Sequence, residues 1–552
     1  MSDRSHALYS VVGLAGVLVL VSMACSSSYI TPARLTATAN AAYIGTTPLP
    51  TAFFVQPSQT PSPQDANNAT LPTIEREPLA PDPTEAVSAT PALAPALPVD
   101  ASAPPTLYRA QAGDTLKALA VRFGVNPIEI VSEKPIPDHE FIEPEQLLMI
   151  PQRIANTTPN QHLMPDSEVV YSPSSADFDP GVFVESIGGY LSDYTEYLGS
   201  TGQTKGADVI QRVAIENSIN PRLLLSLLEH QGHWVFTKPN SLSETDYPLG
   251  HVDLDRRGLY RQLVWAVTQL SIGYYGWREG DLTDLVFTDG ISIRLAPDLN
   301  AGTVALMYYF SQIYGFEDWL TVLDPELGYP ALHEAMFGDP WVRAAIAEPL
   351  FPPNLDQPDL ILPFLIGQLW SYTGGPHGAW EGEGSQAALD FAPGSLESGC
   401  VDSDLWAVAA AAGLVVRSST GVVAIDLDGD GNEQTGWVLV YLHLSSEGRP
   451  PVGQWLDKSD LVGHPSCEGG RSTGTHLHIA RKFNGEWIAA DGPIPFVLSG
   501  WRARAGDAPY LGTLELGDEL ITACTCGSFD TNIKREDPNA KSTSDESQAE
   551  QP

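Results

Sequence analysis

The stretch that decides the fold of the last third of the chain is Gly474-Thr475-His476-Leu477-His478-Ile479-Ala480. On a β-strand the two histidines share one face, because strand side chains alternate with a period of two. One imidazole can then bind a metal ion while the other faces the open position of that metal. Alone, the tripeptide is equally compatible with a structural role, so further ligands have to be found elsewhere in the chain.

Three residues elsewhere in the last third complete such a site. They are His443 in Tyr441-Leu442-His443-Leu444-Ser445, His377 in Gly374-Gly375-Pro376-His377-Gly378, and Asp390 in Ala388-Leu389-Asp390-Phe391. Two histidines and one carboxylate around zinc, with the fourth position left for water, make a catalytic rather than a structural site. The sequence therefore predicts a metallopeptidase.

With these motifs in this order, residues 356–512 resemble the lysostaphin/LytM-type zinc endopeptidases that cut peptidoglycan peptides, and more narrowly their β-lytic (staphylolytic) branch. The resemblance implies a mainly antiparallel β domain with the duplicated hybrid motif of that family. In the more familiar members the first histidine ligand lies four residues before the aspartate, where this chain has Gln386. The β-lytic branch places that histidine farther upstream, and His377, thirteen residues before Asp390, fits its spacing.

Carried over by position, the resemblance assigns His377, Asp390 and His478 as zinc ligands and His443 and His476 as the catalytic pair. The pair would orient or deprotonate water, stabilise the oxyanion and return a proton to the leaving amine. The expected activity is hydrolysis of cross-bridge or stem peptide bonds in peptidoglycan. One alternative is a catalytically inactive LytM-type protein that activates other wall hydrolases, although all three ligand positions are filled here. Another is a glycan-cutting enzyme.

The bulk composition indicates several domains and an acidic surface. A chain of 552 residues exceeds what one hydrophobic core normally organises. Lys and Arg number 29 against 68 Asp and Glu, which gives a net charge of −39 at pH 7. Such a charge argues against nucleic acid as a partner. It is typical of a soluble, exported protein.

Residues 1–24 are predicted to be a signal peptide. Arg4 precedes an apolar run, 11–24, that is too short to span a membrane. The run Ser22-Met23-Ala24-Cys25 resembles the lipobox of bacterial lipoproteins, so Cys25 is expected to be lipidated, with ordinary secretion as the alternative. We therefore expect an exported protein that touches the membrane only through a lipid anchor on its outer face, or a secreted one.

The regions between the folded parts are marked by composition. Residues 25–105 are rich in Pro, Thr, Ala and Ser and predict an extended linker that holds the folded parts away from the membrane. A second linker is expected at 153–180. Residues 513–552 are interpreted as a C-terminal extension that ends in a disordered tail.

Residues 106–152 are expected to form a compact βααβ unit. The runs Gly113-Asp114-Thr115-Leu116, Phe123-Gly124-Val125-Asn126 and Leu148-Met149-Ile150-Pro151 resemble the LysM module, which binds glycans that contain N-acetylglucosamine. The resemblance implies that Gly113, Asp114 and Thr115 bind glycan and that the unit targets the protein to peptidoglycan. A module that has lost its ligand is the alternative.

Residues 181–352 are predicted to be all-α, because apolar residues recur at helical spacing in 207–216, 221–230, 260–274 and 300–314. The run Asn220-Pro221-Arg222-Leu223-Leu224 resembles the lytic-transglycosylase branch of the lysozyme-like fold. That family needs a glutamate where this chain has Gln231, and an amide cannot transfer the proton. The domain is therefore predicted to bind or scaffold, but not to cleave glycan. Its aromatic residues are predicted to pack in the core, with a saccharide groove as the alternative.

Four cysteines follow the predicted export signal: Cys400, Cys467, Cys524 and Cys526. An even number outside the cytoplasm suggests disulfides. Cys524 and Cys526 are predicted to be too close in sequence to pair comfortably, which favours a bond between Cys400 and Cys467.

A calcium site is a further candidate. The run Asp426-Leu427-Asp428-Gly429-Asp430-Gly431 opens like a calcium loop of EF-hand type, with Asp426, Asp428 and Asp430 as ligands. The twelfth position, however, is Trp437 rather than glutamate. Because strand-like segments flank the run, a hairpin turn rich in Asp and Gly is the alternative.

Overall fold

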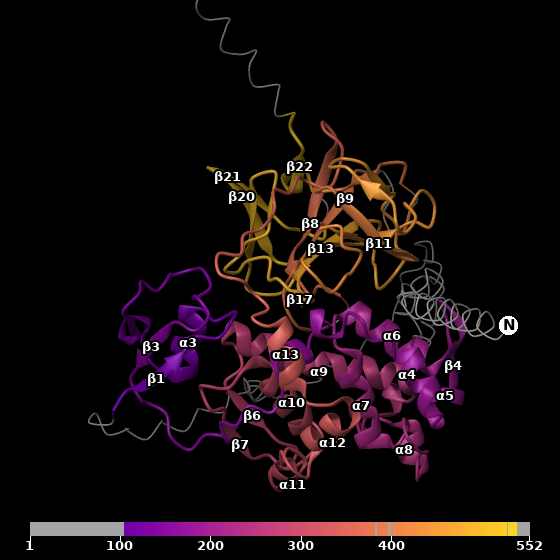
Figure 1. Cartoon of the computed structure of the whole chain (residues 1–552). Helices are drawn as coiled ribbons and strands as arrows, with labels where there is room; N and C mark the ends of the chain where they lie inside the picture. Colours follow the sequence, from indigo (N-terminus) through magenta and orange to yellow (C-terminus); the bar gives the residue numbers. More distant parts are fainter. Residues whose placement is uncertain (1–103, 381–382, 396–398, 402, 527, 538–552) are drawn as a thin grey trace, which may run out of the picture.

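The computed structural model describes residues 104–380, 383–395, 399–401, 403–526 and 528–537 (Figure 1). The predicted signal peptide, Cys25 and nearly all of the first linker lie outside these residues. Within them, no helix is long and apolar enough to cross a membrane.

The first folded unit lies at the start of the described chain, in the segment for which the sequence predicted a LysM-like module, and it is called by that name below. Its elements are β1 (Thr106–Arg109), α3 (Leu116–Phe123), the 3-10 turn η1 (Pro127–Glu129), β2 (Val131–Ser132) and β3 (Leu147–Ile150). The strands form an antiparallel sheet in the order β1-β3-β2. The predicted second helix is wrong, because the chain after Glu129 turns into β2, and Pro135 and Pro137 lack the amide donors that a helix requires.

The second unit is helical, and the four helices predicted from periodicity are all present. They are α6 (Gly206–Asn217), α7 (Pro221–Gly232), α9 (Leu259–Glu279) and α10 (Ala301–Ser311). The other helices are α4 (Pro180–Ile187), α5 (Tyr190–Asp193), α8 (Leu242–Asp246), α11 (Phe316–Val322), α12 (Tyr329–Phe337) and α13 (Pro340–Ala347). The domain is not purely α, because it also contains the hairpins β4 (Thr195–Leu198)/β5 (Gly202–Lys205) and β6 (Asp284–Val286)/β7 (Ser292–Arg294).

Three neighbouring aromatic residues of α9 are buried. Tyr274 and Trp277 are fully buried in its core, and Tyr275 is nearly so. The expectation of core packing is confirmed for Tyr274 and Trp277, whereas Tyr275 also lines a small pocket against the peptidase-like domain.

The third unit is built on one large antiparallel sheet, drawn in orange and yellow in Figure 1. Its strands, in spatial order, are β14 (Trp455–Leu456), β11 (Gly413–Ser419), β12 (Gly421–Asp426), β13 (Trp437–Leu444), β16 (Leu477–Phe483), β9 (Ala388–Pro393), β8 (Leu369–His377) and β22 (Asn532–Lys534). The short strand β17 (Glu486–Trp487) pairs with β16, and β10 (Ala407–Val408) pairs separately with β15 (Leu461–Gly463). The predicted mainly antiparallel β domain is confirmed.

A smaller sheet covers one face of the large one. It contains β18 (Val497–Leu498), β19 (Trp501–Ala505), β20 (Gly512–Leu516) and β21 (Glu519–Thr522). The predicted boundary at residue 512 cuts through β20, and β22 pairs with β8 at the edge of the large sheet. Residues 513–534 are therefore part of the peptidase-like domain rather than an appendage to it.

The two faces of the large sheet have different partners. Alternate residues such as Leu389, Leu439 and Ile479 face the smaller sheet. Their neighbours Ala388, Val440 and Ala480 share a core with the helical domain. Because Asp390 and His478 follow the same alternation as Ala388 and Ala480, the helical domain packs against the sheet face that carries these two residues.

Arg278 of α9 joins all three units. It donates to the carbonyl of Ala112 in the LysM-like module, and its guanidinium lies 3.0 Å from an Asp166 carboxylate oxygen in the segment that precedes α4. In the peptidase-like domain it lies 3.1 Å from Glu486 on β17, which also accepts a hydrogen bond from Tyr274. All of these charged side chains are buried or nearly so.

Replacing Arg278 by Met should therefore destabilise the whole assembly. The substitution leaves Asp166 and Glu486 buried without their cation, which typically costs about 3–5 kcal/mol. Chemical denaturation followed by tryptophan fluorescence measures the loss. The matched control is Lys458→Met, which breaks an exposed pair with Asp359 and should change little. Equal effects of the two substitutions would contradict this role for Arg278.

Candidate metal centre and catalytic histidines

Strand register brings the predicted ligands together. His478 on β16 lies opposite Asp390 on β9, and Asp390 lies opposite Gly374 on β8, the strand that ends at His377. A Cβ at Gly374 would lie 2.5 Å from Oδ2 of Asp390, so only glycine leaves room for the carboxylate. Three neighbouring strands thus supply one side chain each to a single point.

The three ligand atoms lie close to one another and are buried. His377 Nε2 is 3.0 Å from His478 Nδ1, and Asp390 Oδ1 lies 3.3 Å from the first nitrogen and 3.2 Å from the second. The other ring nitrogen of each histidine bonds a backbone carbonyl, that of Gly375 for His377 and that of Ala379 for His478. Because Nδ1 of His377 and Nε2 of His478 donate to these carbonyls, the lone pairs of His377 Nε2 and His478 Nδ1 point toward the centre of the group.

This arrangement fits a zinc ion. Ligand atoms about 2.0–2.1 Å from a tetrahedral zinc lie roughly 3.3 Å apart, close to the observed separations. Asp390 Oδ1 is buried and accepts no hydrogen bond within the described part of the chain. Backbone carbonyls that fix the outer nitrogen of a histidine are a regular feature of metal sites. His377, Asp390 and His478 accordingly form a group that could hold a metal ion.

The electrostatics of the three side chains are strongly coupled. Burial alone would raise the pKa of Asp390, but the neighbouring His377 and His476 hold it well below its usual range. Burial lowers the pKa of His478. The pKa of His377 is raised, because attraction to Asp390 outweighs the burial that would lower it. An anionic carboxylate therefore persists at the centre of the group, as a cation site requires.

His443 and His476 stand side by side next to this group. Their ring centroids are 4.5 Å apart, and His476 Nε2 lies 3.7 Å from Asp390 Oδ1. Each donates its Nδ1–H to a backbone carbonyl, His443 to Glu468 at 2.9 Å and His476 to Gly474 at 2.8 Å. In the neutral tautomer this leaves Nε2 of each ring as a base.

His443 owes its position to an irregularity of β13. The register between β12 and β13 shifts beside it, and its backbone has φ of +63°, a left-handed conformation that is rare for a residue with a side chain. Burial, and then the neighbouring His476 and His478, lower the pKa of His443 to about 3. His443 is therefore neutral at physiological pH and can accept a proton.

Tyr510 and Leu511 pack against this site and are not identified from the sequence. The half-exposed ring of Tyr510, from the loop between β19 and β20, stacks on His377 with centroids 4.1 Å apart. Its carbonyl accepts from the amide of Gly375 at 2.8 Å. A Cβ at Gly375 would lie 2.5 Å from the carbonyl oxygen of Leu511. The doubled glycine of β8 was the available signal, since it marks a close backbone approach.

Gln386 stands apart from the metal-ligand group. Its side-chain amide donates to the carbonyl of Gly384 at 3.2 Å. The group within ligand distance contains His377 instead. The structure therefore brings together the residues expected from the β-lytic spacing.

The predicted glycan-binding residues of the LysM-like module have structural contacts. Asp114 is buried and accepts from Tyr108 at 2.6 Å and from Arg122 at 2.7 Å. The hydroxyl of Thr115 caps α3, and Gly113 lies against Arg278. Glycan binding by this loop stays a prediction.

In the helical domain, the glutamate two residues before Gln231 has a structural role. Glu229 is buried and accepts hydrogen bonds from the amides of Val235 and Phe236. The Gln231 side chain accepts from Tyr314. The absence of glycan cleavage by this domain stays a prediction.

The aspartate loop is a turn between β12 and β13, and Asp426, Asp428 and Asp430 lie near enough to share a cation. The carboxylate of Asp426, however, already accepts from the amides of Asp428 and Gly431. These hydrogen bonds account for the shape of the turn without a cation. Calcium binding stays a prediction.

Both cysteine pairs form disulfides. The bond between Cys400 and Cys467 is confirmed, with a Cα–Cα distance of 5.7 Å. Cys524 and Cys526 are also bonded, so the expectation that they are too close to pair is wrong. Their Cα atoms are 5.1 Å apart, inside the usual range for disulfides, because the chain turns between them.

Comparison with known proteins adds independent information. The family model described as the N-terminal domain of LasA matches residues 162–352, which includes the helical domain. Protease LasA of Pseudomonas aeruginosa is 27% identical over 370 residues, covering 62% of this chain and 78% of the relative. The beta-lytic metalloendopeptidase of Achromobacter lyticus is 28% identical over 158 residues, covering 27% of this chain and 39% of the relative.

Solved structures of similar proteins include the M23 metalloprotease pseudoalterin, at 24% identity and a TM-score of 0.26, covering 30% of this chain and 96% of that one. The catalytic domain of lysostaphin from Staphylococcus simulans is 21% identical with a TM-score of 0.15, covering 22% of this chain and 87% of that one.

Alanine substitutions should show whether His377 or Gln386 supplies the first metal ligand. His377→Ala should abolish metal binding, because it removes one of three converging donors, whereas Gln386→Ala should leave the metal content unchanged. Metal per chain is measured by inductively coupled plasma mass spectrometry after gel filtration. Retention of metal by His377→Ala together with its loss from Gln386→Ala would show that the wrong ligand has been identified.

Proposed function

We propose that this chain, a metalloendopeptidase similar to protease LasA, is a zinc-dependent enzyme that hydrolyses peptide bonds of peptidoglycan. The observation that carries the proposal is the convergence of His377 Nε2, His478 Nδ1 and Asp390 Oδ1 within 3.0–3.3 Å of one another, beside a pair of histidines. An inactive wall-binding activator has no need of such a complete set. The relatives named as proteases support the enzymatic reading.

Two groups of residues would carry out peptide hydrolysis, one that holds the metal and one that transfers protons. His377, Asp390 and His478 would hold the zinc, which when bound lowers the pKa of water and polarises the scissile carbonyl. His443, neutral and with Nε2 unprotonated, is placed to take a proton from the attacking water. The side chain of His476 is 17% exposed, against 3% for His377 and 6% for His478, so it can meet the substrate and donate to the leaving amine.

Peptidoglycan as the substrate rests on two supports. The motif order of the peptidase-like domain resembles enzymes of the lysostaphin/LytM type. The LysM-like module resembles domains that bind N-acetylglucosamine-containing glycans, and would hold the enzyme at the wall. An export signal and a lipid anchor at Cys25 complete this proposal, since wall peptides lie outside the cell.

The helical domain would act as a scaffold rather than as a second catalytic unit. It carries Gln231 where an acid is needed, and it packs on the sheet face that bears the metal ligands. In this account it positions the targeting module and borders the site, and glycan strands stay intact. Calcium in the aspartate loop would only stabilise the hairpin.

Digestion of purified peptidoglycan tests the activity and the role of His443 together. The wild-type chain should release fragments with new amino termini and no anhydro-sugars, identified by mass spectrometry. His443→Ala should keep its zinc but lose about a hundredfold or more in rate, because general-base catalysis contributes roughly that much. Release of anhydromuramic products would instead indicate a glycan-cutting enzyme. Unchanged turnover by His443→Ala would remove this residue from the mechanism.

Deleting residues 106–152 should weaken pull-down on insoluble peptidoglycan and leave hydrolysis of a short soluble peptide largely unchanged. The reason is that the module has its own core, while the candidate catalytic residues all lie beyond residue 370. Circular dichroism checks that the shortened chain is folded. Equal binding of the two proteins to peptidoglycan would contradict a targeting role.

A further inference from the structure

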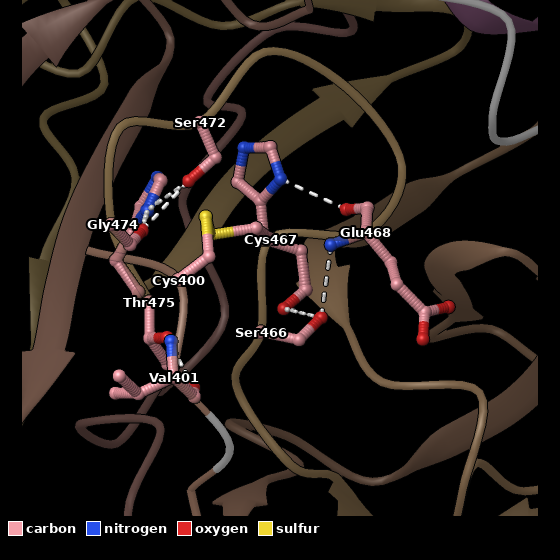
Figure 2. The surroundings of a disulfide bond; sticks show 10 residues. Cys400, Val401, Ser466, Cys467, Glu468, Ser472, Gly474 and Thr475 are labelled. Carbon is pink, nitrogen blue, oxygen red and sulfur yellow. Dashed lines mark hydrogen bonds between the residues drawn. A yellow bond between two sulfur atoms is a disulfide. The ribbon is translucent and has the colours of Figure 1, made fainter.

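The disulfide between Cys400 and Cys467 (Figure 2) joins two short segments that hydrogen-bond to the candidate catalytic histidines or to the residue beside one of them. The bond closes a separation of 67 residues. Cys467 lies between Ser466 and Glu468, and Cys400 lies between Gly399 and Val401. The segment around Cys467 contacts His443, and the carbonyl of Ser466 also accepts the amide of His476 at 3.5 Å. The segment around Cys400 contacts Thr475, the residue before His476.

The segment around Cys467 fixes His443. The Glu468 carbonyl accepts the Nδ1–H of His443 at 2.9 Å. On the other side of Cys467, the amide of Ser466 donates to the His443 carbonyl at 2.6 Å, and the Ser466 hydroxyl donates to the same oxygen at 3.1 Å. Both the ring and the backbone of His443 are thus held by the residues that flank one cysteine.

These contacts matter because His443 has a left-handed backbone. Such a conformation costs on the order of 1–3 kcal/mol in a residue that is not glycine, and it persists only where its surroundings impose it. Here the hydrogen bonds with Ser466 and Glu468 hold His443 in this backbone conformation. Any shift of this segment would rotate the imidazole away from its position beside His476.

The segment around Cys400 fixes the residue that precedes His476. The Gly399 carbonyl accepts from the amide of Thr475 at 3.0 Å. The Thr475 hydroxyl accepts from the amide of Val401 at 2.9 Å and donates to the carbonyl of the same residue. Figure 2 shows Thr475 and Val401 side by side below the disulfide.

We infer that the Cys400–Cys467 disulfide is a positioning element for the catalytic pair, setting the distance between His443 and His476 rather than holding the metal. It connects the support of one histidine covalently to the support of the other. The inference rests on the proposed function, in which these two histidines carry the proton transfers. Within the described part of the chain, the hydrogen bonds named above from these two segments reach no metal ligand, so we expect the zinc site to survive loss of the disulfide.

The test compares the full-length wild-type chain with a Cys400→Ser/Cys467→Ser variant and, as a matched control, a Cys524→Ser/Cys526→Ser variant. For each protein, zinc per chain is measured, and kcat and KM are measured with a soluble glycine-containing peptide. The first variant should lose at least about tenfold in kcat with KM and zinc content unchanged, as is typical when a supporting contact is removed. The control variant should keep the wild-type kcat, because its disulfide contacts neither histidine segment.

A second pair of variants preserves the disulfide and keeps the test decisive if the first variant folds poorly. Thr475→Val removes the hydroxyl contact with Val401 and should lower kcat severalfold without loss of zinc. Thr475→Ser retains a hydroxyl and should recover most of that kcat. Similar values for the two substitutions would overturn the inference.

The remaining outcomes separate this inference from the proposed function. A wild-type chain that binds no zinc or cleaves no peptide contradicts the proposed function itself. An active wild type whose kcat survives loss of Cys400 and Cys467 contradicts only the positioning role. Loss of zinc in parallel with kcat also overturns it, because the disulfide would then maintain the fold of the whole site.

Discussion

The constraint on which this structure depends is the approach of three electron-rich atoms, two imidazole nitrogens and one carboxylate oxygen, within 3.0–3.3 Å of one another in a buried place. Both histidines direct their other ring nitrogen to a backbone carbonyl, which leaves lone pairs facing inward. Such an arrangement is unfavourable unless a positive charge occupies its centre. A proton on His377 relieves part of the repulsion, whereas a zinc ion satisfies all three donors at once.

The rest of the peptidase-like domain supports the group formed by His377, Asp390 and His478. Gly374 leaves space for Asp390, and the loop of Tyr510 closes over His377. The smaller sheet packs on the reverse face, and the helical domain packs on the ligand-bearing face through a shared core. Arg278 then ties the LysM-like module to the other two units. The first unit, the helical domain and the candidate site are therefore held in one arrangement.

Much of this could be predicted from the sequence, because the relevant signals are local. Apolar periodicity identified α6, α7, α9 and α10, and the alternation around Leu477 placed His476 and His478 on one face. What could not be predicted depends on contacts between distant segments. The backbone conformation of His443 is imposed by residues 466–468, and the pairing of β22 with β8 joins segments more than 150 residues apart. The stacking of Tyr510 on His377 likewise follows from no local sequence pattern.

The most direct measurement of the central claim is X-ray absorption at the zinc K edge of the purified full-length protein. A site formed by His377, Asp390 and His478 should give one zinc per chain, a first shell of nitrogen and oxygen atoms only at about 2.0–2.1 Å, and outer-shell scattering from two imidazole rings. A first shell that contains sulfur near 2.3 Å, or one with no imidazole scattering, would contradict it. So would a protein that holds no zinc after purification in zinc-supplemented buffer.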